Sequence, residues 1–357
     1  MKILFVITGL GMGGAENLVS NLADFYYESG HEVEIIYAVG EVKVSPKNSS
    51  IKLTSLNISS YMGFFKAYFK LRKLIKDRSP DVVHSHMIHA NILTRLVRAT
   101  CYIPKLICTA HSTNEGGKIR MLAYRLTDYL SDEFTNVSSA AVEEFIFKGA
   151  VKSNRILSVP NGVDTTRFQP PKPNNIARSS GKKTYSLLSV GRFNESKDYP
   201  TLFNAIKNLS QLRNDFFLNI VGDGELQDEM IALAKKLNID EHVNFLGVRK
   251  DVEKLMASCD VFLLSSRYEG FGLVVAEAMS CERIIVATDC GGVQEIVGEG
   301  KVLVPVGDYI KFSSEINYYL NLSQSERHRL GQNNRNRIVS NFSLSSTAEQ
   351  YISLYKR

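Results

Sequence analysis

The 357-residue sequence lacks any run of about 18 consecutive apolar residues, the length that a helix needs to cross a bilayer. Its first residues, MKILFVITGLGMGG, are apolar over too few positions for a secretory signal, and they run straight into a glycine loop. The sequence also lacks a Cys-x-x-Cys pair, and its five cysteines are scattered. We therefore expect a cytoplasmic protein with reduced thiols and no transmembrane span. The cysteines are Cys101, Cys108, Cys259, Cys281 and Cys290.

Metal-ligating patterns are absent as well. No Asp-x-Asp motif occurs, so nothing signals a nucleotide diphosphate held through a metal ion. His84 and His86 are two residues apart on an expected strand and share one face, and His89 follows them. No carboxylate or cysteine completes a ligand set around these histidines. The sequence therefore predicts no metal site.

Charge of one sign is in only mild excess. The formal net charge is +6, 44% of the residues are hydrophobic and 22% are charged, which is typical of a soluble globular protein. Such an excess would suit nucleotides, phosphates or an anionic membrane surface. It is far below the charge density of a dedicated nucleic-acid binder, so we expect no nucleic-acid partner.

The chain is too long for one ordinary core and suggests two domains. Short β-rich runs alternate with helical stretches, stop at the polar, proline-rich segment QPPKPNNIARSSGKK, and then resume. This alternation predicts an α/β fold with two facing Rossmann-like domains and ligands bound in the cleft between them, at the carboxyl ends of the strands. The domains are expected at residues 1–170 and 171–340. The expected strands are Ile3–Thr8, Glu32–Val39, Ile51–Leu56, Asp81–Ser85, Lys105–Thr109, Phe134–Ser138, Ile156–Val159, Tyr185–Val190, Phe217–Val221, Val243–Leu246, Val261–Ser265, Ile284–Thr288 and Val302–Val304.

The most informative segment is Glu269-Gly-Phe-Gly-Leu-Val-Val-Ala-Glu277, which lies between two of the expected strands. It predicts a glycine turn followed by a short helix. Backbone N–H groups at the start of that helix favour an anion, because the helix leaves them without acceptors and its dipole is positive there. Glu269 and Glu277 supply acceptors for hydroxyl groups. The segment therefore predicts a pocket for a sugar phosphate, with amides from Gly270, Phe271, Gly272 and Leu273.

Two cations follow the strand that opens the second half of the chain. Arg192 can bind a diphosphate as a bidentate fork and Lys197 as a mobile point charge. The alternative is a pair of solvated loop charges. In the next strand–turn segment, Val221–Glu225, we expect glycines that let a nucleobase approach the backbone, unless the segment is an ordinary turn. The residues expected to line this part of the site are Gly222, Gly224, Glu225 and, in a similar strand end, Val248.

A glycine loop also follows the first expected strand. The pattern Gly9-x-Gly11-x-x-Gly14 matches the spacing of a dinucleotide fingerprint, with Glu34 where a ribose ligand would lie. A NAD-dependent dehydrogenase is therefore one alternative, and a loop that merely lets the first helix pack closely is another. A third is that amides of Gly13 and Gly14 meet a diphosphate that arrives from the other domain.

Two features of the first half of the chain indicate possible contacts, one with substrate and one with a membrane. His111 ends the strand LICTA and is expected to face the cleft and contact substrate. The segment Tyr61–Lys76 has helical period, with an apolar stripe and a basic face. It is either an ordinary crossover helix or a basic-aromatic contact with an anionic inner membrane. The stripe comprises Tyr61, Phe64, Phe65, Tyr68, Leu71 and Ile75, and the basic face comprises Lys66, Lys70 and Lys73.

Taken together, these motifs resemble the retaining family-four glycosyltransferases of the GT-B fold, of the type that builds bacterial surface polysaccharides. The resemblance spans nearly the whole chain and rests most specifically on the two glutamates of the Glu269–Glu277 segment. It implies that residues 1–170 form the acceptor side and residues 171–340 the nucleotide-sugar side. It also implies that a C-terminal helix within residues 341–357 returns to the first domain. The other matching motifs are GlyGlyAlaGlu (Gly13–Glu16), ValProAsnGlyValAsp (Val159–Asp164), ValGlyArg with Lys197, and GlyAspGlyGlu (Gly222–Glu225).

The resemblance implies retaining, metal-independent transfer of a sugar from a nucleotide diphosphate sugar, with a UDP-sugar expected ahead of a GDP-sugar. Arg192 and Lys197 would neutralise the diphosphate, Glu277 would bind the ribose, and Glu269 would lie beside the sugar. The amides of Phe271–Leu273 would hold the sugar and the distal phosphate. Gly14 would cap the diphosphate, and His111 would contact the sugar near the reacting carbon. No cofactor is implied.

The acceptor implied by the resemblance is a lipid-linked glycan of a surface polysaccharide. The chain departs from the family pattern after His111, where it reads SerThrAsnGluGlyGly, so Asn114 and Glu115 become acceptor-side candidates. A sugar-nucleotide epimerase of similar two-domain shape is the nearest alternative enzyme.

Overall fold

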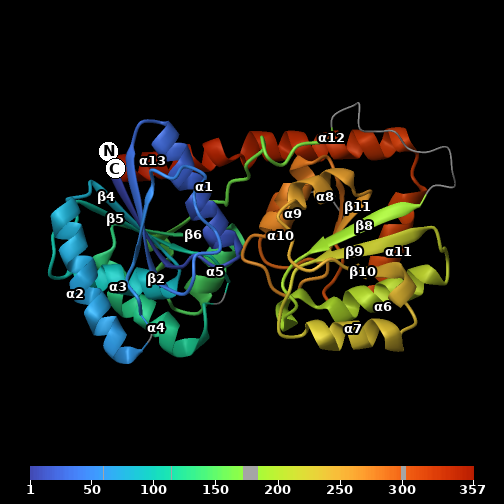
Figure 1. The fold of residues 1–357 in the computed structure, drawn as a ribbon, viewed down its shortest axis with the longest axis horizontal. Helices are drawn as coiled ribbons and strands as arrows, with labels where there is room; N and C mark the ends of the chain where they lie inside the picture. Colours follow the sequence, from blue (N-terminus) through green and yellow to red (C-terminus); the bar gives the residue numbers. More distant parts are fainter. Residues whose placement is uncertain (59, 114, 172–183, 299–302) are drawn as a thin grey trace. The chain divides into compact units, whose positions relative to one another are not determined.

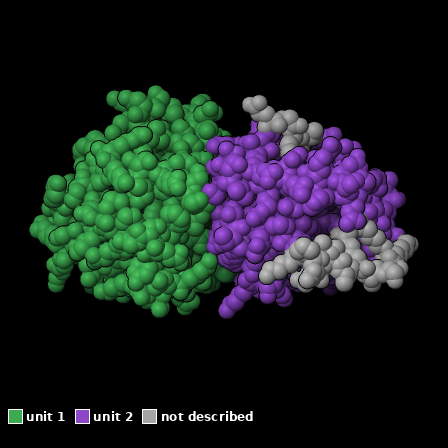
Figure 2. Space-filling view, turned by 90° about the horizontal axis from the view of Figure 1, so that it is seen from above, with its two compact units in different colours: residues 1–162, 344–357 green, residues 163–343 purple. Residues whose placement is uncertain are grey.

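A computed structural model describes residues 1–58, 60–113, 115–171, 184–298 and 303–357 (Figure 1). The chain divides into two compact units, which Figure 2 colours separately. Unit 1 comprises residues 1–162 and 344–357, and unit 2 comprises residues 163–343. Each contains one all-parallel sheet with helices, as expected for two Rossmann-like domains.

The division falls after Gly162 rather than after residue 170, because the next few residues pack on unit 2. The Val163 amide donates to the Phe342 carbonyl at 2.9 Å, and Val163 forms a parallel bridge with Ser343. The Phe168 carbonyl accepts a hydrogen bond from Ser280 Oγ at 2.5 Å. Most of the proline-rich segment that was expected as a linker lies outside the described residues.

Unit 1 contains a seven-stranded sheet of order β3-β2-β1-β4-β5-β6-β7. Its strands are β1 (Lys2–Gly9), β2 (Glu32–Val39), β3 (Lys52–Ser55), β4 (Val82–His86), β5 (Lys105–Ala110), β6 (Glu133–Asn136) and β7 (Ile156–Ser158). Its α-helices are α1 (Gly14–Glu28), α2 (Tyr61–Arg78), α3 (Ile88–Arg98), α4 (Gly117–Thr127), α5 (Ser139–Phe147) and the C-terminal α13 (Leu344–Lys356).

Helices cover both faces of this sheet, because alternate residues of a strand point to opposite sides. Leu4 and Val6 of β1 join a core with residues of α2, α3, α4 and α5. Ile3, Phe5 and Ile7 join a second core with residues of α1 and α13 (Figure 1). The chain thus returns from unit 2 to complete unit 1, and the implied C-terminal helix is present.

Unit 2 contains a five-stranded sheet of order β10-β9-β8-β11-β12. Its strands are β8 (Tyr185–Val190), β9 (Phe216–Val221), β10 (Val243–Phe245), β11 (Val261–Leu264) and β12 (Ile284–Ala287). Its α-helices are α6 (Tyr199–Ser210), α7 (Gln227–Lys236), α8 (Val252–Ser258), α9 (Leu273–Ser280), α10 (Val293–Val297), α11 (Tyr309–Asn321) and α12 (Gln324–Asn341).

The observed strands correspond to the expected ones, with one exception. The run Val302–Val304 is not a strand in the part of the chain that the structure describes: Val302 lies outside that part, and Val304 forms an isolated bridge with Thr288. In both units the strands are parallel, so their carboxyl ends share one edge of the sheet. The loops that leave this edge carry the residues considered next.

Candidate active site

In unit 2, the segment that follows β11 turns sharply into α9. Gly272 has φ of 92°, a left-handed conformation that glycine adopts without strain, and it caps the helix that begins at Leu273. Phe271 is buried and packs against the Phe342 ring at a centroid distance of 5.7 Å. Helix geometry leaves the amides of the first two residues of α9 without intrahelical acceptors, whereas the Val275 amide donates to the Gly272 carbonyl at 2.9 Å. The strand, glycine turn and helix therefore form as the sequence predicted.

Lys197 and Glu269 are brought together at this edge. Lys197 ends a short 3-10 helix, Glu195–Lys197, after β8, and its Nζ lies 2.5 Å from Glu269 Oε1. Ser266 Oγ donates to the same carboxylate oxygen at 2.7 Å, and Ser265 Oγ donates to the Lys197 carbonyl at 2.8 Å. The sequence placed the cation at the diphosphate and the acid at the sugar. Because the two groups touch, one ligand could contact both. The two serines were not predicted.

Arg192 lies at the same edge of the sheet, in the loop after β8, but it is not part of the Lys197–Glu269 pair. Its side chain is exposed and forms no ion pair with the residues that the structure describes. Its backbone neighbours are fixed, since the Phe193 amide donates to the Asp223 carbonyl at 2.8 Å. The loop after β8 therefore packs against the loop after β9.

Contact between those two loops explains two of the predicted glycines. Gly222 and Gly224 have φ of 145° and 157°. A Cβ at Gly222 would lie 2.0 Å from the Gly191 carbonyl oxygen, and one at Gly224 would lie 2.4 Å from that of Phe193. The close approach that requires glycine here is that of the chain's own backbone, and the approach of a nucleobase stays a prediction. The neighbouring Glu225 and Val248 are exposed.

Glu277 lies one turn into α9. Burial raises the pKa of its carboxyl to about 8, and Glu253 adds to this effect while Arg167 opposes it. Arg167 is itself paired with Glu253, at 3.0 Å. At neutral pH the Glu277 carboxyl is therefore mostly protonated, and it can donate one hydrogen bond as well as accept.

In unit 1, three histidines gather at the carboxyl ends of β4 and β5. His86 Nδ1 and His111 Nε2 are hydrogen-bonded at 2.9 Å, and the rings of His84 and His86 lie 4.0 Å apart. His84 is bonded at both ring nitrogens, to Tyr355 Oη and Thr109 Oγ1, each at 2.7 Å. Sequence reasoning placed His84 and His86 on one face but missed their partners, because the pairing of β4 with β5 and the return of α13 are tertiary features.

These histidines are uncharged. Burial lowers the pKa of His84 and His86 well below the usual value and that of His111 to about 3. His111 Nδ1 and His86 Nε2 are buried and have no partner among the described residues. His89 lies apart, exposed on α3. Within the described ranges, no set of three His, Cys, Asp or Glu side chains could hold a metal ion.

The backbone of His111 is held by Glu115. The His111 amide donates to Glu115 Oε1 at 2.9 Å, and the Tyr124 hydroxyl donates to the other carboxylate oxygen. The Ile88 amide, at the start of α3, also donates to this carboxylate. Glu115 thus closes the loop after β5, and its place on the acceptor side stays a prediction. Asn114, the other candidate, lies outside the described residues.

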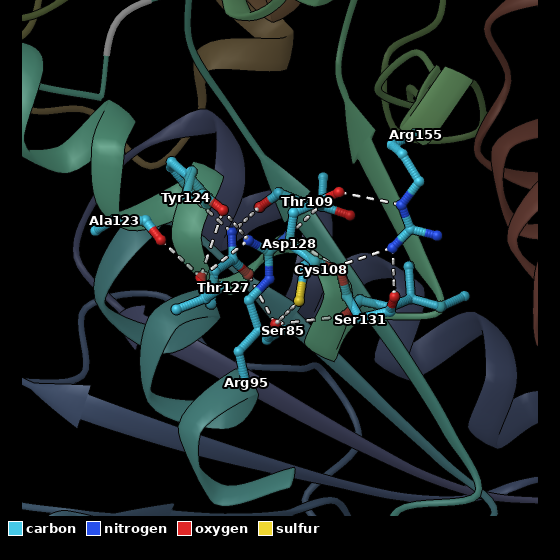
Figure 3. Close-up of polar contacts among 12 residues, drawn as sticks. Ser85, Arg95, Cys108, Thr109, Ala123, Tyr124, Thr127, Asp128, Ser131 and Arg155 are labelled. Carbon is cyan, nitrogen blue, oxygen red and sulfur yellow. Dashed lines mark hydrogen bonds and ion pairs between the residues drawn. The ribbon is translucent and has the colours of Figure 1, made fainter. Parts of the chain in front are cut away.

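A buried arginine, Arg95, contacts Tyr124, the residue that binds Glu115 (Figure 3). Arg95 is 0% exposed and lies over the rings of Tyr124 and Phe134, at 5.4 and 4.6 Å from their centroids. Its guanidinium donates to the Tyr124 carbonyl at 3.2 Å and to Ser131 Oγ at 3.1 Å. Asp128 is ion-paired with it at 3.7 Å. Arg95 therefore fixes α4 against α3, and no sequence motif signalled it.

The glycine loop of unit 1 precedes α1 as predicted. Gly13 caps the helix in an extended conformation, and a Cβ there would lie 2.5 Å from Glu16 Oε2. Glu34, the ribose ligand of the dinucleotide alternative, is instead paired with Arg78 at 3.0 Å and accepts from Thr54 Oγ1 at 2.8 Å. The loop therefore lacks the available acid that a dinucleotide site would need.

Among the side chains of helix α2 that the structure describes, which exclude Tyr61, one departs from the expected pattern. Leu71 and Ile75 are buried, as predicted, but Phe65 is 64% exposed and does not belong to the packed stripe. Phe69, also exposed, lies one turn further along the same outward face. None of the described helices has the length and hydrophobicity of a membrane span.

Two family models match this chain. The model described as Glycosyltransferase Family 4 matches residues 12–167, and the one described as Glycosyl transferases group 1 matches residues 172–337. Together they cover both units. The chain belongs to the family-four glycosyltransferases, and it is an enzyme of the glycosyltransferase class.

Curated relatives span most of the chain. One from Campylobacter jejuni, named N-acetylgalactosamine-N,N'-diacetylbacillosaminyl-diphospho-undecaprenol 4-alpha-N-acetylgalactosaminyltransferase, is 26% identical over 315 residues, 84% of each chain. A second from the same organism, named GalNAc-alpha-(1->4)-GalNAc-alpha-(1->3)-diNAcBac-PP-undecaprenol alpha-1,4-N-acetyl-D-galactosaminyltransferase, is 27% identical and covers 99% of this chain and 98% of the other.

Solved structures show the same fold at low identity. HepE of Anabaena, in complex with UDP, has a TM-score of 0.82 at 20% identity, with 99% of each chain covered. Sucrose-phosphate synthase of Thermosynechococcus elongatus has a TM-score of 0.84 at 20% identity and covers 100% of this chain and 98% of the other. These likenesses establish the GT-B fold.

Proposed function

We propose that the protein transfers a sugar, with retention of configuration, from a nucleotide diphosphate sugar to a lipid-linked glycan in surface-polysaccharide synthesis. The observation that carries this proposal is the contact of Lys197 with Glu269 beside the N-terminus of α9, with Glu277 one turn further. A cation, helix-terminal amides and two carboxyl groups suit a ligand that has both phosphates and hydroxyls.

Each group has a distinct role in donor binding. Lys197, together with the exposed Arg192, offsets the charge of the diphosphate leaving group. The amides of Phe271, Gly272 and Leu273 bind the sugar and the distal phosphate. Glu277, protonated by burial, both accepts from and donates to the ribose hydroxyls. Contacts of Gly222, Gly224, Glu225 and Val248 with the nucleoside, and of Gly13 and Gly14 with the diphosphate, stay predictions.

The reaction breaks the bond between the anomeric carbon and the diphosphate oxygen through an oxocarbenium-like transition state. The acceptor hydroxyl attacks from the face that the leaving group vacates, and its proton passes to the departing phosphate oxygen. Glu269 is ion-paired with Lys197, which disfavours its use as a nucleophile and favours this front-face route. Stabilising the departing phosphate is then the main electrostatic task.

His111 contributes a neutral ring beside the reacting sugar. Its Nε2 is bonded to His86, so Nδ1 is the ring nitrogen left for a sugar hydroxyl. Because the ring is uncharged, it can orient the sugar without opposing positive charge on the anomeric carbon.

The substrates are proposed from the relatives. Both Campylobacter jejuni enzymes bear names that specify undecaprenol-linked diphosphate glycans. We propose a lipid-linked acceptor of this kind and an enzyme at the cytoplasmic face of the membrane, with α2 as one contact. A UDP-sugar is proposed ahead of a GDP-sugar, and HepE, of the same fold, was solved with UDP. No metal ion or cofactor is proposed.

A thermal-shift panel of nucleotides tests the proposal. At about 100 times its dissociation constant, a true ligand stabilises the fold by about 2.7 kcal/mol. We expect UDP or a UDP-sugar to raise the melting temperature and NAD to leave it unchanged. Product analysis with the best donor should then show free nucleoside diphosphate and an extended glycan. Release of a changed sugar nucleotide would point to an epimerase, and stabilisation by NAD alone would point to a dehydrogenase.

A further inference from the structure

Helix α4 carries apolar side chains on two opposite faces. Met121 and Tyr124 are buried against the rest of unit 1. Ile119, Leu122 and Leu126 follow the spacing i, i+3, i+7 on the other face and are 85%, 55% and 63% exposed. A surface helix of a globular protein normally presents polar residues outward. A contiguous exposed apolar stripe of this kind marks a site of interaction.

The charged side chains of α4 itself are all positive. Between Gly117 and Thr127 the chain has Lys118, Arg120 and Arg125 and no acidic residue. Lys118 and Arg125 are exposed, and Arg120 holds the Glu115 carbonyl at 2.9 Å. The outward face of α4 therefore combines large aliphatic side chains with cations only.

A second helix of unit 1 has an outward face of the same kind. Helix α3 packs between α2 and α4, and Figure 1 shows the three on one side of the sheet. On α2, Phe65 and Phe69 are 64% and 66% exposed, and the exposed Lys66 and Lys73 lie on the same side of the helix. Two helices that cover the same face of the sheet thus expose apolar side chains among cations.

We propose that the outward stripe of α4, formed by Ile119, Leu122 and Leu126, inserts into the interfacial region of an anionic lipid bilayer. The aliphatic side chains enter the acyl boundary while Lys118 and Arg125 meet the lipid phosphates. Charge complementarity favours a bilayer over a protein partner, because every charged side chain of α4 is positive. The stripe begins shortly after the loop of His111 and Glu115. Contact with the bilayer brings lipid-linked glycans to that loop; the identity of the acceptor as such a glycan rests on the proposed function.

A fluorescent reporter tests insertion directly. The chain contains no tryptophan, so a single introduced indole reports only its own surroundings. Leu122→Trp should show a blue-shifted emission with vesicles of phosphatidylglycerol and phosphatidylcholine, and little shift with phosphatidylcholine alone. Leu212→Trp is the matched control, because Leu212 is 63% exposed in unit 2, and its emission should not change. Equal shifts at the two positions would overturn the proposal.

Vesicle co-sedimentation separates the two parts of the contact. Replacing Ile119, Leu122 and Leu126 together with Gln should weaken binding at least about tenfold at any ionic strength, since apolar burial is lost. Lys118→Gln with Arg125→Gln should weaken it about tenfold in low salt and little in high salt. The same comparison applied to Lys66→Gln with Lys73→Gln tests α2. Ile310→Gln with Leu212→Gln, at exposed apolar positions of unit 2, should leave binding unchanged.

The outcomes distinguish this surface from the proposed function. If the triple Gln variant binds vesicles like the unaltered protein, the membrane stripe is wrong, whatever UDP does to the melting temperature. If the unaltered protein ignores vesicles but sediments as a dimer, and the triple variant is a monomer, the stripe is an interface between copies and the proposal is overturned. If vesicle binding behaves as expected but no nucleotide stabilises the protein, the surface stands and the proposed function fails.

Discussion

The two units have the same type of fold but use the carboxyl edge of the sheet differently. In unit 2 the edge carries charge, with the Lys197–Glu269 pair and the exposed Arg192 on neighbouring loops. In unit 1 the histidines at the corresponding edge are uncharged, since His84, His86 and His111 are buried and hydrogen-bonded. The comparison teaches that one architecture can present ion-paired side chains in one copy and neutral polar side chains in the other.

The strongest way to break this comparison is to remove the charge of unit 2. Lys197→Ala should lower the rate of transfer roughly a hundredfold to a thousandfold, because the departing diphosphate loses a positive group. The melting temperature should change little, as Glu269 keeps its bond to Ser266. Lys207→Ala, at an exposed position on α6, is the matched control and should retain full activity. Near-normal turnover of the Lys197 variant would refute the site assignment.

The neutral side is tested at His86. His86→Phe removes the hydrogen bond to His111 and should lower kcat about tenfold, the effect of one lost bond. His86→Asn retains a donor near the position of Nδ1 and should restore part of the rate. His84 lies two residues before His86 on the same strand. His84→Phe should lower the melting temperature, without a comparable loss of activity at temperatures where the variant is folded. Equal losses from both Phe variants would reduce His86 to a packing role.

In unit 2 the Glu277 carboxyl is mostly protonated at neutral pH, and a change of pH tests this protonation. Its folded pKa of about 8 lies above that of an exposed carboxyl, so its contribution to stability is complete below pH about 4.5 and is lost as pH rises through about 8. Glu277→Gln cannot ionise and should gain a few degrees of melting temperature over the unaltered protein between pH 5 and pH 9. Glu229→Gln, exposed on α7, should show no such trend. A difference that does not grow with pH would contradict the protonated form.

The smallest effect should come from EDTA. If the positive charge at the diphosphate comes from Lys197, Arg192 and the α9 terminus, chelation should leave the rate of transfer unchanged. A strict requirement for a divalent ion would show that the cations of the chain are insufficient.

Much of the fold was predictable from local pattern. Strand runs such as Glu32–Val39 and Tyr185–Val190 have the bounds expected of them, because buried parallel strands read as continuous apolar runs between turn residues. Phe65 was the clear error in a helix. Helical period alone placed it on the packed stripe, yet burial is decided by which neighbours the helix meets.

The site was only partly predictable. Lys197, Glu269 and Glu277 were identified from their places after strands, and their common edge follows from parallel pairing. The link from His86 to His111 was not, since it depends on the register of β4 against β5. Arg95 and the hydrogen bonds of Glu115 to distant segments were not predicted either, because a buried polar group whose partners come from several loops leaves no local motif.

The sequence by itself determined the α/β class, the two-domain plan, the glycine turn into α9 and the acids and cations at the strand ends. These follow from periodicity and turn chemistry, which act over a few residues. Only the tertiary structure decided which charged side chains form ion pairs and which histidines are neutral. It also decided that Gly222 and Gly224 contact the backbone of another loop, and that Ile119, Leu122 and Leu126 of α4 are exposed. Burial and contact between distant segments set those properties, and neither is encoded in the local pattern.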